Sequence, residues 1–316
     1  MLSALLVAAA ALTAAGDSPD WAFANTLLAE HERNAALSAD CAFTFKEFRS
    51  QIFFKGKVKT EADIEAVVEV ARRGEDLLVK RNETTNVKRE DGSLDTLRLD
   101  LVKNGDYIAH STSPGTHIEL FYHDRPGPAF DPNRGANAIP RALGVGPHKC
   151  GFGDGHSPLA GILWAAREAA SELTCKPVRE GEPLYALEIT RPSGVFSRII
   201  VDASKGALIV SAVKLQDDRK LSELEVVPGR FQDLWFPKSW KRTKYDKAGN
   251  VLVYSSSELT DFSNSASSID FTYASILPSE ETPVIVFDNA GEMVHMYSVD
   301  GVLVDRALAG VARQSR

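Results

Sequence analysis

Short runs of alternating apolar and polar residues fill the second half of the chain, with turn residues between them. The expected strands are 184–190, 195–202, 207–215, 221–227, 238–245 and 251–261. Strands of this length at nearly even spacing, separated by Gly, Pro, Asn and Asp, are typical of an antiparallel meander. The pattern therefore predicts an antiparallel sheet over 184–273.

An amphipathic helix is expected near the start of the chain, over 21–37. Its apolar stripe is formed at helical spacing by Phe23, Leu27, Leu28, His31 and Ala35. A histidine on such a stripe is more often a packing residue than a metal ligand, and we interpret His31 in this way.

The first half also contains strand patterns. We expect strands at 41–54, 66–72, 77–82, 94–102, 107–111 and 117–123. Residues 61–80 also allow a helix capped by Thr60, but Val67, Val68 and Val70 are β-branched and residues 73–76 are typical of a hairpin turn. A last hairpin is expected from 284–287 and 292–299, followed by a short helix over 305–316.

Residues 124–157 interrupt the strand pattern with many Pro and Gly residues. Ser157 is then an expected helix N-cap, with Pro158 at the first helical position. The expected helix reaches Leu173. We interpret 124–176 as an insertion between two halves of a sheet, with its helix packed on that sheet.

The N-terminal residues 1–16 are nearly all apolar and end in the small residues Thr13-Ala14-Ala15. This is the pattern of a secretory signal peptide, and the run is shorter than the roughly 20 residues of a spanning helix. We therefore expect a periplasmic or otherwise exported protein, soluble after cleavage and without a stable membrane span. The predicted organisation is a signal at 1–16, a single domain at 17–300 and a tail at 301–316.

Composition narrows the class of function further. The 316 residues are 44% hydrophobic and 25% charged, as in an ordinary globular chain, and the formal net charge is −7. Nucleic-acid binding needs clustered Lys and Arg, and no basic stripe with interleaved aromatics occurs. We expect no nucleic-acid partner.

Reactive side chains gather at one place, as His148, Cys150, Asp154 and His156. These are metal-ligand types, but their spacing matches no zinc signature, so a metal-dependent enzyme is the less favoured alternative. The sequence also lacks a Gly-x-Ser-x-Gly elbow. We predict no catalytic residue, no metal and no cofactor.

Three cysteines are present: Cys41, Cys150 and Cys175. In an oxidising compartment two of them can pair, and we favour Cys150 with Cys175 because both flank the insertion. Such a bond would stabilise by roughly 3 kcal/mol on the chain-entropy model. The alternative is three free thiols, with Cys41 as a core residue.

Two segments of the meander resemble a known family. The run 199–208 contains an aspartate, a Lys-Gly turn and a new strand. Residues 233–238, Asp-Leu-Trp-Phe-Pro-Lys, precede a hairpin turn at 245–250. Both resemble the LolA/LolB-like lipoprotein carriers of the periplasm. The resemblance covers about 184–273 and is weaker before it.

This resemblance implies an α+β fold, a strongly curved antiparallel sheet forming an incomplete barrel with helices over its concave face. It also implies an apolar cavity for the acyl chains of a lipid or lipoprotein, as a curled sheet covered by helices would leave. Trp235, Phe236, Trp240 and Phe271 are the expected lining residues, or else plain core. The alternative function is an envelope sensor or scaffold that contacts another envelope protein.

Overall fold

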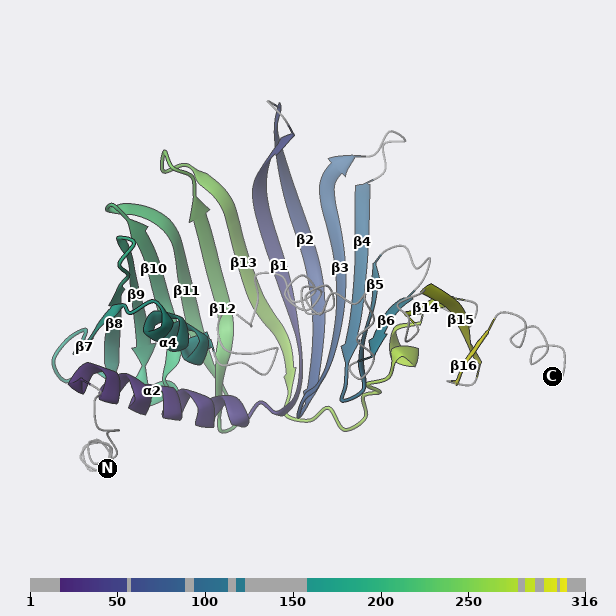
Figure 1. Cartoon of the computed structure of the whole chain (residues 1–316), viewed down its shortest axis with the longest axis horizontal. Helices are drawn as coiled ribbons and strands as arrows, with labels where there is room; N and C mark the ends of the chain where they lie inside the picture. The colour runs from purple at the N-terminus through teal and green to yellow at the C-terminus, as the bar shows by residue number, and fades with distance from the viewer. Residues whose placement is uncertain are drawn as a thin grey trace. The chain divides into compact units, whose positions relative to one another are not determined.

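The computed structural model describes residues 18–55, 58–88, 94–112, 118–122, 158–277, 282–287, 293–299 and 302–305. They fall into two compact units. Unit 1 takes its described residues from 1–38, 49–61 and 146–259, and unit 2 from 39–48, 62–145 and 260–316. Each unit is mostly antiparallel sheet with few helices (Figure 1).

Unit 1 is a run of hydrogen-bonded neighbours from β13 to β7, with two helices. Its elements are α2 (Pro19–Ala36), α4 (Pro158–Glu168), β7 (Glu172–Pro177), β8 (Leu184–Thr190), β9 (Val195–Asp202), β10 (Leu208–Gln216), β11 (Arg219–Phe231), β12 (Leu234–Tyr245) and most of β13 (Val251–Ser263). The pairings from β7 to β13 are all antiparallel. The meander predicted over 184–273 is confirmed up to the end of β13.

The two helices lie on the same side of the unit 1 strands (Figure 1). Their apolar faces join the strands in one buried cluster, which includes Ala24 and Leu27 of α2, Leu159 and Leu163 of α4, and Leu187 of β8. Ser18 caps α2 by accepting a hydrogen bond from the Trp21 amide, and Pro19 occupies the first turn. The two helices thus pack on this part of the sheet, whereas the predicted covering of a concave face and the predicted incomplete barrel stay predictions.

His31 of α2 is 1% exposed, and its Nδ1 lies 3.0 Å from the carbonyl oxygen of Ala207. The interpretation of His31 as a packing residue is confirmed.

The predicted helix over 157–173 was too long. α4 ends at Glu168, Ala170 adopts a positive φ of 47°, and the chain then becomes β7. A residue in the left-handed region ends a helix because the next amides turn away from its axis. Leu173 is buried as expected, but as a strand residue in the same apolar cluster. The end of the predicted insertion is therefore an edge strand of the unit 1 sheet.

Unit 2 holds a second run of strands. Its elements are most of β1 (Asp40–Lys55) and β2 (Val58–Arg73), then β3 (Asp76–Lys88), β4 (Leu94–Lys103), β5 (Tyr107–Thr112), β6 (Ile118–Tyr122), η3 (Tyr273–Ile276), β14 (Pro283–Phe287), β15 (Met293–Val299) and β16 (Val302–Asp305). Neighbours pair antiparallel from β2 to β6, whereas β14 joins β6 in parallel. β14 and β15 confirm the predicted last hairpin, and the predicted tail helix lies outside the described residues apart from Asp305.

The ambiguity over 61–80 is resolved in favour of strands. β2 and β3 are paired from Ile64 and Thr85 to Arg73 and Asp76, a longer hairpin than the two short strands predicted. Unit 2 has its own apolar cluster, containing Ala71, Leu78, Leu120, Tyr107 and Phe271 among others. The predicted domain limits, 17–300 with an insertion at 124–176, stay a prediction.

Candidate functional site

A pocket of about 460 Å³ opens on one face of unit 2. The lining residues of three consecutive strands, β1 to β3, are here called its floor, and the other lining residues come from the end of β13 and from the segment after it. Its lining residues are Ala42, Phe43, Thr44, Glu69, Val70, Ala71, Leu78, Lys80, Asp261, Ser263, Ile269, Asp270 and Ser275.

Strand register explains why the floor is apolar at one end and charged at the other. Ala71 of β2 lies opposite Leu78 of β3, and Glu69 lies opposite Lys80. Directly opposed residues share a face of the sheet, so all four point the same way. Ala71 and Leu78 also belong to the unit 2 apolar cluster, against which Ala42 and Ile269 pack. The pocket therefore continues outward from that core.

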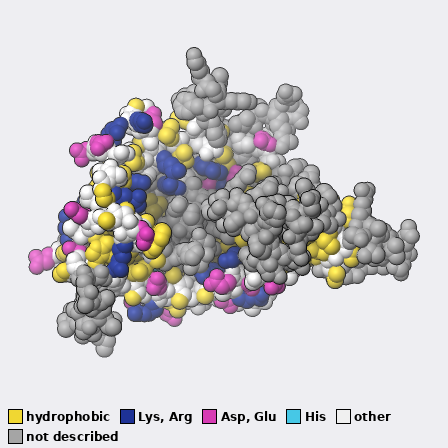
Figure 2. All heavy atoms as spheres, in the orientation of Figure 1, with side chains coloured by type: hydrophobic (Ala, Val, Ile, Leu, Met, Phe, Trp, Pro, Cys, Tyr) yellow, Lys and Arg dark blue, Asp and Glu magenta, His cyan; other side chains and the backbone are white. Residues whose placement is uncertain are grey.

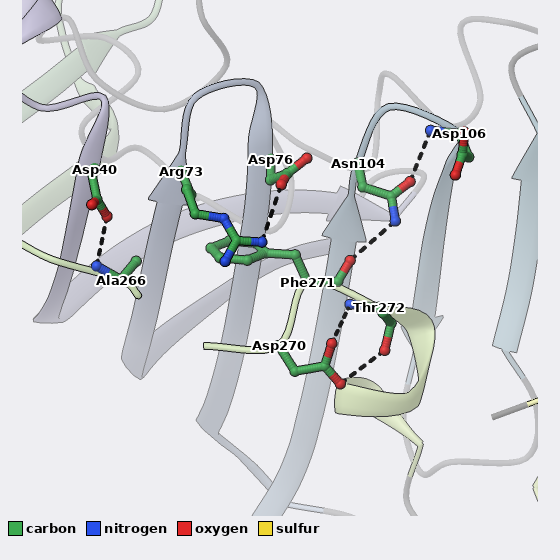
Figure 3. Close-up of polar contacts among 9 residues, drawn as sticks. All are labelled: Asp40, Arg73, Asp76, Asn104, Asp106, Ala266, Asp270, Phe271 and Thr272. Carbon is green, nitrogen blue, oxygen red and sulfur yellow. Dashed lines mark hydrogen bonds and ion pairs between the residues drawn. The ribbon is translucent and has the colours of Figure 1, made fainter. Parts of the chain in front are cut away.

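The segment 264–277, here called the strap, lies over the strands of unit 2 and is tied to them by side-chain hydrogen bonds (Figure 3). The Ala266 amide donates to Asp40 Oδ1 at 2.7 Å, and Asn104 Nδ2 donates to the Phe271 carbonyl at 3.1 Å. The Tyr273 amide donates to the Tyr107 hydroxyl at 2.9 Å. The strap is thus fixed on both sides of Ile269 and Asp270, the residues that it contributes to the pocket.

Arg73 contacts the strap at the aromatic ring of Phe271. The guanidinium carbon of Arg73 lies 4.7 Å from the centroid of the Phe271 ring, and its Nη2 lies 3.5 Å from Asp76 Oδ2 (Figure 3). Asp270 accepts from the amide and hydroxyl of Thr272 at 3.0 and 2.8 Å, which fixes its carboxylate. These contacts order the residues beside the pocket mouth.

Charge around the pocket is mixed. Among the lining residues that the structure describes, Lys80 is the one cation, together with the carboxylates of Glu69, Asp261 and Asp270. Asp100 of β4 lies opposite Lys80, is 2% exposed, and pairs with Arg98 at 2.7 Å. Burial raises the pKa of the Asp100 carboxyl, and the Arg98 guanidinium opposes that rise. The pocket thus combines apolar residues at one end of its floor with charged residues at the other.

An apolar pocket with a few polar groups is an arrangement that can bind a ligand. Apolar pockets with a few polar groups, of roughly 300–1,000 Å³, are the usual sites for small hydrophobic ligands. Within the described ranges, no group of three or more His, Cys, Asp and Glu is placed to hold a metal ion. The sequence cluster of His148, Cys150, Asp154 and His156 lies outside the described residues.

The four aromatic residues predicted to line a cavity lie elsewhere. Phe236 and Trp240 of β12 and Phe271 of the strap are at most 3% exposed. Trp235 is half-buried, with Lys205 Nζ 5.7 Å and Arg230 Cζ 5.9 Å from its ring centroid. None of the four is a lining residue of the pocket under the strap, and their contact with a ligand stays a prediction.

Neither described cysteine has the lowered thiol pKa that is typical of a reactive cysteine. Cys41 is buried, and burial raises the pKa of its thiol to about 12. Burial likewise raises the pKa of the half-buried Cys175 to about 12. Both are free thiols in the structure. Cys150 lies outside the described residues, so the disulfide between Cys150 and Cys175 stays a prediction.

Among the helices that the structure describes, none is both long and apolar enough to cross a membrane.

No family model matches the sequence, and no curated protein matches it. The solved structures to which the chain is similar include the following three. A DUF1329 family protein from Desulfovibrio piger is 8% identical, with a TM-score of 0.40, over 80% of this chain and 98% of that chain. A domain from Vibrio parahaemolyticus assigned to outer membrane lipoprotein sorting is 10% identical, with a TM-score of 0.39, over 79% and 98%.

The third, a LolA superfamily protein from Nitrosomonas europaea, is 9% identical, with a TM-score of 0.34, over 76% of this chain and 92% of that chain. The predicted resemblance to the LolA-like carriers is thus found again among solved structures. Because these identities and TM-scores are low, the case for a function rests on the geometry of the chain itself.

Proposed function

We propose that the protein is a non-enzymatic, exported carrier that holds the acyl chain of a lipid or lipoprotein in the pocket under the strap. The observation that carries this proposal is the pocket of about 460 Å³ on unit 2, whose apolar floor is continuous with the core of that unit. Burying an acyl chain there removes apolar surface from water, at about 0.8 kcal/mol for each CH₂ group.

The polar residues of the pocket support the same assignment. Ser263 and Ser275 bring hydroxyls, and Lys80 and Glu69 bring opposite charges, so a polar headgroup finds hydrogen-bond partners at the rim. The apolar floor and the polar rim together match an amphipathic ligand.

The direct test is native mass spectrometry of the protein after gentle extraction. We expect a population carrying lipid mass and a titratable affinity for a fluorescent long-chain fatty acid. Ala42→Leu, which fills the floor of the pocket, should weaken probe binding by about tenfold, because the added methyl groups occupy the space of the chain.

The matched control is Ala274→Leu. Ala274 is exposed, belongs to the strap, and does not line the pocket. It should bind the probe like the parent protein. Protein that is always empty and shows no affinity for the probe would refute the carrier function, and equal binding by Ala42→Leu and the parent would move the ligand away from this pocket.

A further inference from the structure

The charges that line the pocket under the strap are mostly negative. Among the lining residues that the structure describes, three carboxylates, those of Glu69, Asp261 and Asp270, accompany one ammonium, that of Lys80, which gives a formal charge of −2. The visible surface in Figure 2 is different, because Lys and Arg side chains lie among Asp and Glu side chains along the lower edge of the view. The pocket lining therefore carries an excess of one sign of charge.

The charged end of the floor is balanced by itself. Register places Glu69 of β2 and Asp100 of β4 on either side of Lys80. Directly opposed residues share a face of the sheet, so the ammonium lies in a row between two carboxylates. Lys80 and Glu69 shift the pKa of Asp100 in opposite directions, which indicates that the three charges interact. Arg98 pairs with Asp100 at 2.7 Å, so this group contains two cations and two carboxylates.

Asp261 and Asp270 add negative charge to this balanced group. Asp261 lies near the end of β13 and Asp270 lies in the strap, and both are exposed. The hydrogen bonds of Asp270 come from the amide and hydroxyl of Thr272, which are neutral donors. Asp261 makes no hydrogen bond or ion pair within the described ranges. Neither carboxylate is therefore paired with a cation in the part of the chain that the structure describes.

The serine hydroxyls of the lining also present acceptors. Ser263 Oγ donates to the carbonyl oxygen of Ser265 at 3.1 Å, and Ser275 Oγ donates to the carbonyl oxygen of Thr272 at 2.7 Å. A hydroxyl has one proton and two lone pairs, so a hydroxyl that has already donated its proton can only accept. Toward a ligand, these two hydroxyls therefore offer lone pairs, as the carboxylates do.

A buried acceptor in the same group of charges also lacks a donor. Asp100 is 2% exposed, and its Oδ1 atom has no hydrogen-bond partner. Buried polar atoms in folded proteins are nearly always paired, so an unpaired acceptor beside Lys80 is unusual. The polar end of the pocket and its surroundings thus contain more acceptors than the described donors satisfy.

From this excess of acceptors we propose that the pocket under the strap selects amphiphiles whose headgroup carries a primary ammonium. An ammonium has three N–H donors and no acceptor, so it complements carboxylates and hydroxyls that can only accept. A carboxylate or phosphate headgroup would instead bring more acceptors and meet the negative charges of Asp261 and Asp270. Glu69, Asp261 and Asp270 then determine specificity. This inference rests on the proposed carrier function and adds the class of headgroup to it.

Calorimetric titration with three probes of one chain length tests the headgroup: a long-chain alkylamine, the matching alcohol and the matching fatty acid, each below its micellar concentration. We expect the amine to bind about three- to tenfold more tightly than the alcohol, because each exposed carboxylate adds a modest attraction and several act together. The fatty acid should bind more weakly than the amine. Higher salt should weaken binding of the amine and leave that of the alcohol nearly unchanged.

The outcomes separate this inference from the carrier function. A fatty acid or alcohol that binds as tightly as the amine would overturn the headgroup assignment and leave the carrier function standing. No binding of any of the three probes would refute the carrier function itself. A short amine such as butylamine should bind much more weakly than the long-chain amine, and equal affinity would overturn the amphiphilic part of the proposal.

Glu69→Gln and Glu65→Gln form a matched pair of variants. Both glutamates are exposed and lie on the same face of β2, but only Glu69 lines the pocket. Glu69→Gln should weaken binding of the amine and leave that of the alcohol unchanged, whereas Glu65→Gln should bind both as the parent does. An equal loss of amine binding in the two variants would overturn the proposal.

Two further variants change the charge of the lining in opposite directions. Glu69→Gln/Asp261→Asn removes two carboxylates, so its affinity for the amine should fall close to its affinity for the alcohol. Lys80→Gln removes the ammonium, so it should bind the amine more tightly and the fatty acid more weakly than the parent does. Unchanged amine binding in the double variant, or weaker amine binding in Lys80→Gln, would contradict the proposal.

Discussion

The carboxamide of Asn34 joins α2 to β12 as a neighbouring strand would. Its Nδ2 donates to the Trp235 carbonyl at 2.8 Å, and its Oδ1 accepts from the Trp235 amide at 3.0 Å. The side chain can reach because Gly206, at a φ of +62°, has no Cβ. A Cβ there would lie 2.5 Å from Asn34 Cβ and 2.6 Å from its Cγ. One glycine and one asparagine therefore fix where α2 ends relative to the sheet of unit 1.

Gly206→Ala tests this contact. A left-handed conformation costs a non-glycine residue about 1–2 kcal/mol, and the clash with Asn34 adds to that cost. Gly181→Ala is the control, because Gly181 has a φ of +82° with no atom within 4 Å of the added Cβ. In urea unfolding we expect Gly206→Ala to lose clearly more free energy of unfolding than Gly181→Ala. Equal losses would mean that Asn34 moves aside without cost.

His31 should make unit 1 sensitive to acid. Burial lowers the pKa of its imidazole below the usual 6.5, although the hydrogen bond to Ala207 opposes this. Below pH 6.5 the imidazole therefore binds a proton more readily in the unfolded chain than in the folded chain. The free energy of unfolding is then greatest above pH 6.5 and falls as the pH drops below that value.

The measurement is urea unfolding at about pH 7.5 and about pH 5.5. His31→Gln should reduce the stability lost between the two values. The same loss in the variant and in the parent would show that other groups are responsible.

A buried ion triad lies in unit 2. Arg81 is 0% exposed, with its Nη2 2.8 Å from Glu47 Oε1 and its Nε 2.5 Å from Glu83 Oε1. Burial alone would lower the pKa of the Arg81 guanidinium, but the two carboxylates outweigh it and raise that pKa. The two carboxylates therefore stabilise the charged form of the Arg81 guanidinium.

Arg81→Met should cost about 3–5 kcal/mol of unfolding free energy, because it leaves the buried Glu47 and the half-buried Glu83 without their cation. Combining it with Glu47→Met and Glu83→Gln should recover most of that loss in urea unfolding, since no unpaired charge remains. A triple variant as unstable as Arg81→Met would mean that the packing of the guanidinium, and not its charge, is what matters.

At the scale of elements, strand periodicity was predictable but strand ends were not. Pro228-Gly229 and Pro237 are expected strand breakers, yet β11 and β12 run through them. The two prolines lie opposite each other at a register shift, a place where a missing amide donor is tolerated. Likewise no glycine marks the end of α4, because Ala170 takes the left-handed conformation itself. Both outcomes depend on neighbours that are distant in sequence.

The candidate site was less predictable than the fold. Large aromatic residues such as Trp240 and Phe236 indicate buried surface, and they are buried. The pocket instead uses small residues such as Ala42 and Ala71, whose side chains leave space, and a strap from far along the chain. Sequence alone does not show that Asp40 and Asn104 hold that strap, because their partners are backbone groups of residues 226 and 167 positions away.

The strap should become more mobile if one of its hydrogen bonds to the strands of unit 2 is removed. Tyr107→Phe deletes the acceptor of the buried Tyr273 amide, and a buried unpaired donor costs about 1–3 kcal/mol. Hydrogen exchange should become faster at Tyr273 and its neighbours in the strap. Tyr185→Phe is the control, a half-buried tyrosine whose ring contacts Phe23. Unchanged exchange in the strap of Tyr107→Phe would mean that the other ties are sufficient.

At the scale of the whole molecule, the described residues include one buried apolar cluster in unit 1 and another in unit 2, and these two clusters share no residue. The core of unit 1 joins α2, α4 and β7 to β10, and the core of unit 2 joins the β3 to β6 region to the strap and β14. A unit with its own core can unfold in its own transition, and chains of this kind depart from two-state behaviour. The proposed carrier pocket follows the same division, since all of its described lining residues belong to unit 2.

Leu187→Ala and Leu120→Ala separate the two cores. Leu187 belongs to the unit 1 cluster and Leu120 to the unit 2 cluster, and both are 0% exposed. Each truncation leaves a cavity and should lower the free energy of unfolding by about 2–5 kcal/mol, because the surrounding side chains rarely move enough to fill the cavity. In calorimetry we expect two components, with Leu187→Ala shifting one and Leu120→Ala the other. A single component that both variants shift equally would show instead that the two cores unfold as one, and a ligand in the pocket under the strap would then stabilise the whole chain.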